Sequence, residues 1–208
     1  MFDAVIFDLD GTLIDTESVA MRTGRGILAE MELEAGDDLF HALIGKDGPS
    51  GQLLLRARFP QADVAALVQR WDAAFHAALD GDVPLKPGAK ELLERIDLPM
   101  ALCTSSARES GLRKLEMAGL SQHFVHVITR DDVTAPKPHP EPYLLTAERL
   151  GVTPARCLVF EDSETGAQSA RMAGCVVVQV PDILPTAGLH ADHVAGSLLE
   201  GARLAGVI

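Results

Sequence analysis

The apolar positions of this chain gather into short runs that are separated by longer amphipathic stretches. The runs are Ala4–Phe7, Met100–Cys103, Val125–Ile128, Cys157–Phe160 and Cys175–Val180. Most are rich in Val and Ile, and they do not alternate strictly with polar residues. This pattern is typical of strands that are covered on both faces of a parallel sheet. We therefore predict five buried strands.

Helix-like stretches lie between the later runs. They are Ala89–Ile96, Leu112–Ala118, Tyr143–Leu150 and Gly166–Ala173. The last three end at a glycine of the kind that closes helix carboxyl termini. Strand alternating with helix predicts βαβ units, and hence an α/β fold with a parallel, doubly wound sheet.

Residues 16–86 interrupt this alternation, because they contain amphipathic helix and no convincing strand. Apolar residues between Val64 and Leu79 recur at the period of an α-helix. We expect residues 1–15 and 87–208 to form a core, with a small helical domain of residues 16–86 inserted after the first strand. Such an insertion would lie over the carboxyl edge of the sheet, where open α/β sheets bind ligands.

Composition narrows the class of protein. The chain has 208 residues, of which 47% are hydrophobic, and its mean hydropathy of +0.14 indicates a globular protein. No apolar stretch approaches the ~20 residues that span a bilayer, and no basic region precedes a signal-peptide core. Cys103, Cys157 and Cys175 lie in or beside apolar runs, without the spacing of a zinc site. We expect buried, reduced thiols in a cytoplasmic protein.

The net charge of −12 argues against partners that need a basic surface. We expect neither nucleic acid nor a membrane as a partner, and a monomer or a small homo-oligomer. An anionic substrate would need a metal cation or a few well-placed basic residues in order to bind.

Asp8 and Asp10 follow the first apolar run directly, and Gly11 comes next. Residues two apart on an extended segment point the same way, so the two carboxylates are expected to converge. Convergent carboxylates repel each other and usually hold a cation or move a proton. The same Asp-x-Asp-Gly pattern also occurs in surface turns and calcium loops, so the motif alone leaves both interpretations open.

Three further polar clusters follow other predicted strands. Thr104, Ser105 and Ser106 follow the second run, Lys137 lies between two prolines after the third, and Glu161-Asp162 ends the fourth. Each alone has a plainer explanation, as a helix cap or a solvated lysine. Together they bring hydroxyl groups, a cation and carboxylates to the carboxyl edge of one sheet. This arrangement predicts a single crevice that holds a functional site.

In this order, Asp8-Leu9-Asp10-Gly11-Thr12, Thr104, Lys137 and Glu161-Asp162 resemble the four motifs of the haloacid dehalogenase superfamily. The resemblance runs over nearly the whole chain, and residues 16–86 resemble the helical cap of its first class. It implies a Rossmann-like core with strand order 5-4-1-2-3, similar to phosphoglycolate phosphatase and to β-phosphoglucomutase-like phosphatases.

The resemblance also implies catalytic roles. Asp8 would be the nucleophile that forms an aspartyl-phosphate, and Asp10 the general acid and then the base. Thr104 and Lys137 would bind and neutralise the phosphoryl group. Ser105 is a further candidate for substrate binding, as is Lys46 in the cap.

A magnesium site is implied by the same resemblance. Its ligands would be the carboxylate of Asp8, the main-chain carbonyl of Asp10, Asp162, and Glu161 either directly or through water. Oxygen ligands of this kind suit Mg²⁺. A cation here, together with Lys137, would let a carboxylate approach a phosphate in an acidic protein.

Within the superfamily, Asp10 disfavours dehalogenases, which lack an acid there, and phosphonate-cleaving enzymes, which carry a small residue there. β-Phosphoglucomutases keep both aspartates but place a histidine and an arginine in the cap, where this chain has Ala20 and Gly48. The resemblance thus favours a Mg²⁺-dependent phosphatase acting on a small phosphorylated metabolite, with a sugar phosphate expected. A mutase is the alternative. A catalytically idle binding or regulatory protein is a second alternative, which the intact motif set disfavours.

Overall fold

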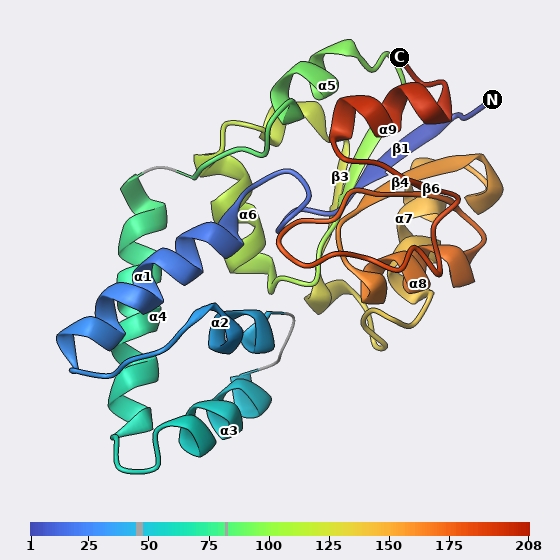
Figure 1. Ribbon diagram of the computed structural model, residues 1–208. Helices are drawn as coiled ribbons and strands as arrows, with labels where there is room; N and C mark the ends of the chain where they lie inside the picture. Colours follow the sequence, from blue (N-terminus) through green and yellow to red (C-terminus); the bar gives the residue numbers. More distant parts are fainter. Residues whose placement is uncertain (45–47, 82) are drawn as a thin grey trace. The chain divides into compact units, whose positions relative to one another are not determined.

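The computed structural model describes residues 1–44, 48–81 and 83–208 (Figure 1). The chain divides into two compact units. The core unit comprises Met1–Asp15 and Val83–Ile208, and the helical unit comprises Thr16–Asp82.

The core unit is built on a parallel sheet. Its strands are β1 (Ala4–Phe7), β2 (Met100–Cys103), β3 (His126–Ile128), β4 (Cys157–Glu161), β5 (Val176–Gln179) and β6 (His193–Val194). They lie in the order β3-β2-β1-β4-β5-β6, and neighbouring strands are parallel. This confirms the α/β fold and the expected order of the first five strands. The two-residue strand β6, which extends the sheet beyond β5, was not predicted.

Helices cover both faces of this sheet. The helices of the core unit are α5 (Ala89–Arg95), α6 (Arg108–Met117), α7 (Glu141–Leu150), α8 (Glu164–Ala173) and α9 (Leu198–Ala205), with 3₁₀ turns at Ser121–His123, Arg130–Asp132 and Pro154–Arg156. Helices α7 and α8 pack together on one face, and α5 packs with α9 on the other (Figure 1). The sheet is therefore doubly wound, and β1 is fully buried at its centre.

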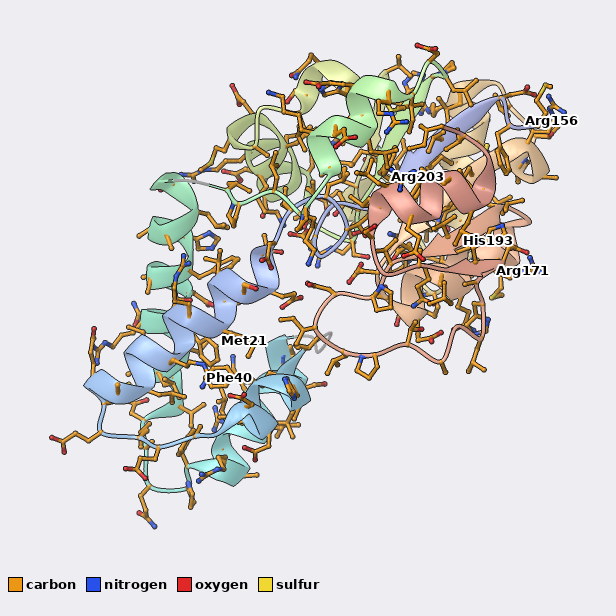
Figure 2. The ribbon with its side chains drawn as sticks, turned by 45° about the horizontal axis from the view of Figure 1, so that its top comes forward. Met21, Phe40, Arg156, Arg171, His193 and Arg203 are labelled. Carbon is orange, nitrogen blue, oxygen red and sulfur yellow. The ribbon has the colours of Figure 1, made fainter. Side chains whose placement is uncertain are left out.

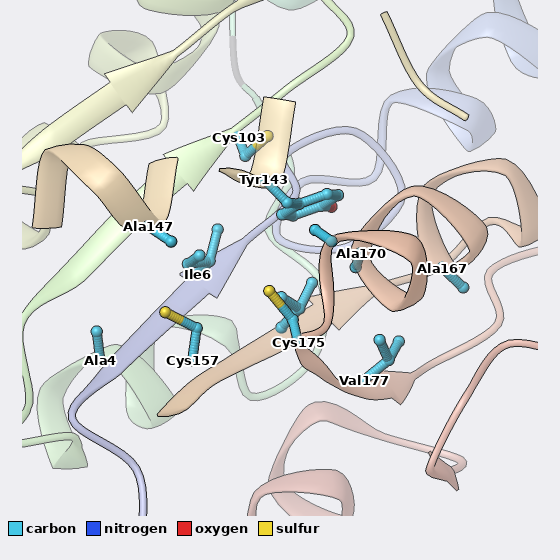
Figure 3. Close-up of a cluster of buried hydrophobic side chains, with 12 residues drawn as sticks. Ala4, Ile6, Cys103, Tyr143, Ala147, Cys157, Ala167, Ala170, Cys175 and Val177 are labelled. Atoms are coloured by element: carbon cyan, nitrogen blue, oxygen red, sulfur yellow. The ribbon is translucent and has the colours of Figure 1, made fainter. Parts of the chain in front are cut away.

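Small side chains let α7 and α8 pack closely against the sheet. Ala167 and Ala170 of α8 belong to one cluster of buried residues with Val177 of β5 and Cys157 of β4 (Figure 3). Burial of each larger aliphatic side chain in this layer contributes roughly 1.5–3 kcal/mol. All three cysteines are buried and free of disulfide bonds.

The helical unit consists of α1 (Thr16–Glu30), α2 (Asp37–Leu43), α3 (Gly48–Arg58) and α4 (Val64–Gly81). The amphipathic helix predicted between residues 64 and 79 is α4. The unit has an apolar core of its own, in which Phe40 of α2 is 2% exposed and Met21 of α1 packs at the margin (Figure 2).

Helices α1 and α4 approach closely at one point in this unit. The indole N–H of Trp71 donates to the carbonyl of Ala20 at 2.8 Å. A Cβ atom on Gly24 would lie 2.0 Å from the Trp71 ring. Only glycine therefore fits at residue 24 without displacing the indole.

The return of the chain into the core unit lies at Val83, before the expected boundary at residue 86. The N–H of Asp15 donates to the carbonyl of Pro84 at 2.8 Å, and the N–H of Lys86 donates to that of Leu13 at 2.9 Å. These bonds tie residues 84–86 to the segment that follows β1. No helix in the described part of the chain is long and apolar enough to cross a membrane.

Candidate active site

Asp8 continues β1 by one residue at the carboxyl edge of the sheet. Its N–H donates to the carbonyl of Phe160 in β4 at 3.0 Å, so the backbone is still held by the ladder. The Asp8 side chain emerges where β1, β2 and β4 end, and the residue is only 6% exposed. A carboxylate at this depth needs a positive partner in order to stay ionised.

Lys137 supplies that partner. Its Nζ donates to Oδ1 of Asp8 at 2.8 Å, to Oε1 of Glu161 at 2.6 Å and to the carbonyl of Cys103 at 2.9 Å. An ammonium group has three N–H donors, so these contacts use all of them. Lys137 is therefore fixed in position between two carboxylates that come from different strands.

Tyr143 supports this pair from α7 and was not singled out from the sequence. Its hydroxyl donates to Oε1 of Glu161 at 2.9 Å, and Nζ of Lys137 lies 4.8 Å from the centroid of its ring. A fully buried tyrosine needs a hydrogen-bond partner for its hydroxyl. That requirement, at the start of the helix after the Lys137 loop, is the signal that could have identified it.

Glu161 is held by many donors. Its Oε2 accepts the N–H groups of Asp162 and Ser163, each at 3.1 Å, and the hydroxyl of Ser163 at 3.0 Å, while Lys137 and Tyr143 donate to Oε1. A Cβ atom at Gly166 would lie 1.7 Å from Oε1. The structure therefore shows Glu161 as an anchor for neighbouring groups, and its expected role as a metal ligand stays a prediction.

Asp162 faces the loop that follows β1. The hydroxyl of Thr12 donates to its Oδ1 at 3.2 Å. Gly11 has a φ of 83°, which is left-handed backbone, and a Cβ atom there would lie 2.4 Å from Oδ2 of Asp162. The glycine of the first motif thus makes room for the carboxylate of the fourth.

The donor set suits a divalent cation. One carboxylate oxygen from each of Asp8, Glu161 and Asp162 lies within 4.8 Å of the other two. Burial raises the pKa of Asp8 to about 7, although Lys137 opposes the rise. Burial, together with the charges of Glu161 and Asp8, also raises the pKa of Asp162 well above its usual range. Three carboxyl groups, two buried and one partly buried, converge beside one lysine, and a hard oxygen-binding cation would offset their mutual repulsion.

The charge of Lys137 is secure in this environment. Burial acts to lower the pKa of its ammonium group, but the facing carboxylates of Asp8 and Glu161 outweigh that effect and raise it well above the ordinary value. The lysine therefore remains a cation beside Asp8.

Asp10 pairs with a different lysine. Nζ of Lys114, on α6, lies 2.5 Å from Oδ1 and 2.6 Å from Oδ2 of Asp10. The hydroxyl of Ser106 donates to Oδ2 at 2.8 Å. Lys114 was not identified from the sequence, since a lysine eight residues after Ser106 on an amphipathic helix looks like a solvated residue.

The three hydroxyl residues after β2 differ in their surroundings. Thr104 is 4% exposed, and its Oγ1 accepts the N–H of Ser106 at 3.1 Å. Ser105 is exposed, so its expected contact with substrate stays a prediction. Lys46, the proposed substrate ligand of the cap, lies outside the described residues.

Comparison with known proteins shows the family of this chain. A family model described as haloacid dehalogenase-like hydrolase matches residues 2–174. The chain belongs to the haloacid dehalogenase-like hydrolase family. This confirms the family that the four motifs indicated.

Two of the relatives are named phosphatases of similar length. The chain is 34% identical to a fructose-1-phosphate phosphatase of Escherichia coli, covering 86% of this chain and 96% of the relative. It is 31% identical to a phosphorylated carbohydrates phosphatase of Thermotoga maritima, covering 83% and 82%. A crystal structure of a hydrolase of this family from Deinococcus radiodurans, with bound phosphate and sodium, superposes with a TM-score of 0.88 at 30% identity, covering 99% and 96%. These names agree with the expected class of enzyme, a hydrolase of phosphoric monoesters.

Proposed function

We propose that this protein hydrolyses a small phosphomonoester through an aspartyl-phosphate on Asp8, with Mg²⁺ as its cofactor. The observation that carries the proposal is the contact of Lys137 with both Asp8 and Glu161, beside Asp162. The arrangement supports the proposal because one fixed cation and two further carboxylates would surround Asp8 as the nucleophile. Phosphoryl transfer requires such a site, because the attacking carboxylate and the phosphate are both anions.

The contacts of Asp8 support its proposed role as the nucleophile. Lys137 holds one of its oxygens, and we propose that the carboxylate attacks phosphorus to form the new O–P bond as the bond to the leaving oxygen breaks. Asp10 would give its proton to the leaving oxygen. In the second step Asp10 would take a proton from water, which attacks phosphorus and releases phosphate and free Asp8.

The groups around the nucleophile would share the remaining tasks. Thr104 would bind a phosphoryl oxygen from the end of β2, and Glu161 would keep Lys137 in place. Mg²⁺ would be held by Asp8, Asp162 and the main-chain carbonyl of Asp10, and when bound it would offset the charge of the carboxylates and the phosphoryl group.

We expect a sugar phosphate as the substrate, since two relatives are named phosphatases of phosphorylated carbohydrates or fructose 1-phosphate. The helical unit would act as a lid that excludes water during the reaction, as mobile elements do in other enzymes. A lid of this kind would restrict the enzyme to compact substrates.

Phosphate release from p-nitrophenyl phosphate tests the proposal. We expect turnover with Mg²⁺, loss of turnover in excess EDTA, and recovery when Mg²⁺ is restored. Asp8→Asn should abolish turnover while its circular dichroism spectrum stays that of the wild type. Full activity in chelator would refute the metal requirement, and substantial hydrolysis by Asp8→Asn would refute the nucleophile.

A panel of sugar phosphates then addresses the substrate. Release of inorganic phosphate is expected for at least one of them. Conversion of one sugar phosphate into an isomer, without net release of phosphate, would instead identify a mutase.

A further inference from the structure

Asp10, Ser106 and Lys114 form a closed set of contacts, which we call the Lys114 cluster. Lys114 donates to both carboxylate oxygens of Asp10 and to Oγ of Ser106 at 2.8 Å, and Ser106 in turn donates to Asp10. The three residues come from the segment after β1, the segment after β2, and helix α6. All of them belong to the core unit.

This contact differs from an ordinary surface ion pair. The side chain of Lys114 is 12% exposed and that of Asp10 is 27% exposed. Lys90 and Glu94 on α5, by comparison, lie 4.0 Å apart with side chains 68% and 56% exposed. Exposed pairs of that kind contribute little, because water and salt screen them. Lys114 is half-buried and contacts both carboxylate oxygens, so it holds Asp10 much more firmly than an exposed pair would.

The cluster also fixes Asp10 relative to the phosphoryl site. The N–H of Ser106 donates to Oγ1 of Thr104, the proposed ligand of a phosphoryl oxygen. Asp10 is thereby tied to the same short segment as Thr104. Asp8, only two residues before Asp10, is bound instead by Lys137.

Without these contacts, the Asp10 carboxylate could adopt a different orientation. It lies two residues from Asp8, and Lys137 and the proposed metal beside Asp8 are the other cations of the site. Without the Lys114 contacts, the carboxylate could turn toward these cations and away from the side on which the leaving group departs. The Lys114 cluster provides an alternative partner of opposite charge on the β2 side.

We propose that Lys114, assisted by Ser106, is the positioning residue for Asp10, which it holds on the leaving-group side of the reaction. This inference rests on the proposed function. Lys114 acts through Asp10, and it need not touch the substrate.

Leaving-group dependence tests this role. The parameter kcat/KM reports the steps up to transfer of the phosphoryl group to Asp8. p-Nitrophenolate needs little protonation as it leaves, whereas the alkoxide of a sugar needs a positioned acid, a contribution of about 10²–10⁴-fold in typical enzymes. Lys114→Met should therefore lower kcat/KM for the best sugar phosphate by about tenfold or more, and for p-nitrophenyl phosphate by less than about threefold.

Two further variants accompany this measurement. Ser106→Ala, at a half-buried position, should also lower kcat/KM more for the sugar phosphate than for p-nitrophenyl phosphate, but by a smaller factor. This variant stays informative if Lys114→Met folds poorly. Lys90→Met removes an exposed lysine of another helix, and should leave kcat/KM unchanged for both substrates.

A double-mutant cycle separates action through Asp10 from a general structural effect. If Lys114 acts through Asp10, Lys114→Met should have no additional effect on kcat/KM in the Asp10→Asn background. The inference is overturned by an equal loss for both substrates, by no loss for the sugar phosphate, or by additive losses in the cycle. A wild-type protein that hydrolyses neither substrate would overturn the proposed function itself, and this inference with it.

Discussion

Gly11 and Asp162 lie so close together that a Cβ atom at residue 11 would be 2.4 Å from Oδ2 of Asp162. We predict that Gly11→Ala lowers kcat by at least about 100-fold and raises the Mg²⁺ concentration required for half-maximal activity. The added methyl group must displace either the carboxylate or the loop, and the positive φ adds strain of about 1–3 kcal/mol. A magnesium titration of the activity measures both effects.

Gly119 provides the matched control for this variant. It also has a positive φ, but a Cβ atom there would meet nothing within 4 Å. Gly119→Ala should cost about 1–2 kcal/mol of stability through strain alone and leave the magnesium titration unchanged. Equal kinetic losses in the two variants would mean that contact with Asp162 is not the cause.

Glu161 and Asp162 are adjacent, and we predict different consequences when each loses its charge. Asp162→Asn should raise the Mg²⁺ concentration for half-maximal activity by about tenfold or more, because it weakens a proposed metal ligand. Glu161→Gln should instead lower thermal stability by about 1–3 kcal/mol, since Lys137 loses a charged acceptor. Activity measured against Mg²⁺, together with thermal unfolding, distinguishes them. A larger shift of the magnesium titration in Glu161→Gln would reverse the assignment.

Tyr143 should affect activity through Lys137 and Glu161. Tyr143→Phe keeps the ring beneath Lys137 and removes the hydroxyl that donates to Glu161, so we expect kcat to fall several-fold and stability to fall by about 1 kcal/mol. Steady-state kinetics and thermal unfolding measure the two changes.

Thr146→Val is the control on the same helix, since the Thr146 hydroxyl is also buried and donates to the carbonyl of Pro142 at 2.7 Å. This variant should lose a similar amount of stability and keep its kcat. If kcat fell equally in both variants, the proposed link between Tyr143 and the site would be incorrect.

Gly24 should determine the packing of the helical unit. Gly24→Ala places a methyl group against the Trp71 ring, and overpacking of this kind costs about 1–3 kcal/mol. Trp71 is the single tryptophan of the chain, so its fluorescence reports this unit directly. Gly26 lies on the same helix with nothing within 4 Å, and Gly26→Ala should stabilise the protein by up to about 1 kcal/mol. Unchanged fluorescence and stability in Gly24→Ala would contradict the close packing of α1 and α4.

Much of the core could be predicted from the sequence because its strands are buried on both faces. The runs Met100–Cys103 and Cys157–Phe160 coincide with β2 and with all but the last residue of β4. Strand β6 could not be predicted, since two residues at the edge of the sheet give no periodic signal.

For the candidate site, the sequence indicated which segments meet but not which atoms pair. The carboxyl ends of parallel strands share one edge, which was enough to bring Asp8, Lys137 and Glu161 together. The partners of each oxygen depend on side chains that arrive from helices. Tyr143 lies on α7 and Lys114 lies on α6. A tyrosine or a lysine on an amphipathic helix is common, so the sequence alone does not indicate which carboxylate either one contacts.

The hydrogen bonds of Asp15 with Pro84 and of Lys86 with Leu13 give the insertion a modular character. They hold the backbone on either side of residues 16–82 together, about 5 Å apart as in any pair of hydrogen-bonded strands. The two core segments that flank the insertion are thus hydrogen-bonded to each other directly. A segment joined in this way can differ in length or sequence without any change in the strands that precede Asp8 and carry Glu161.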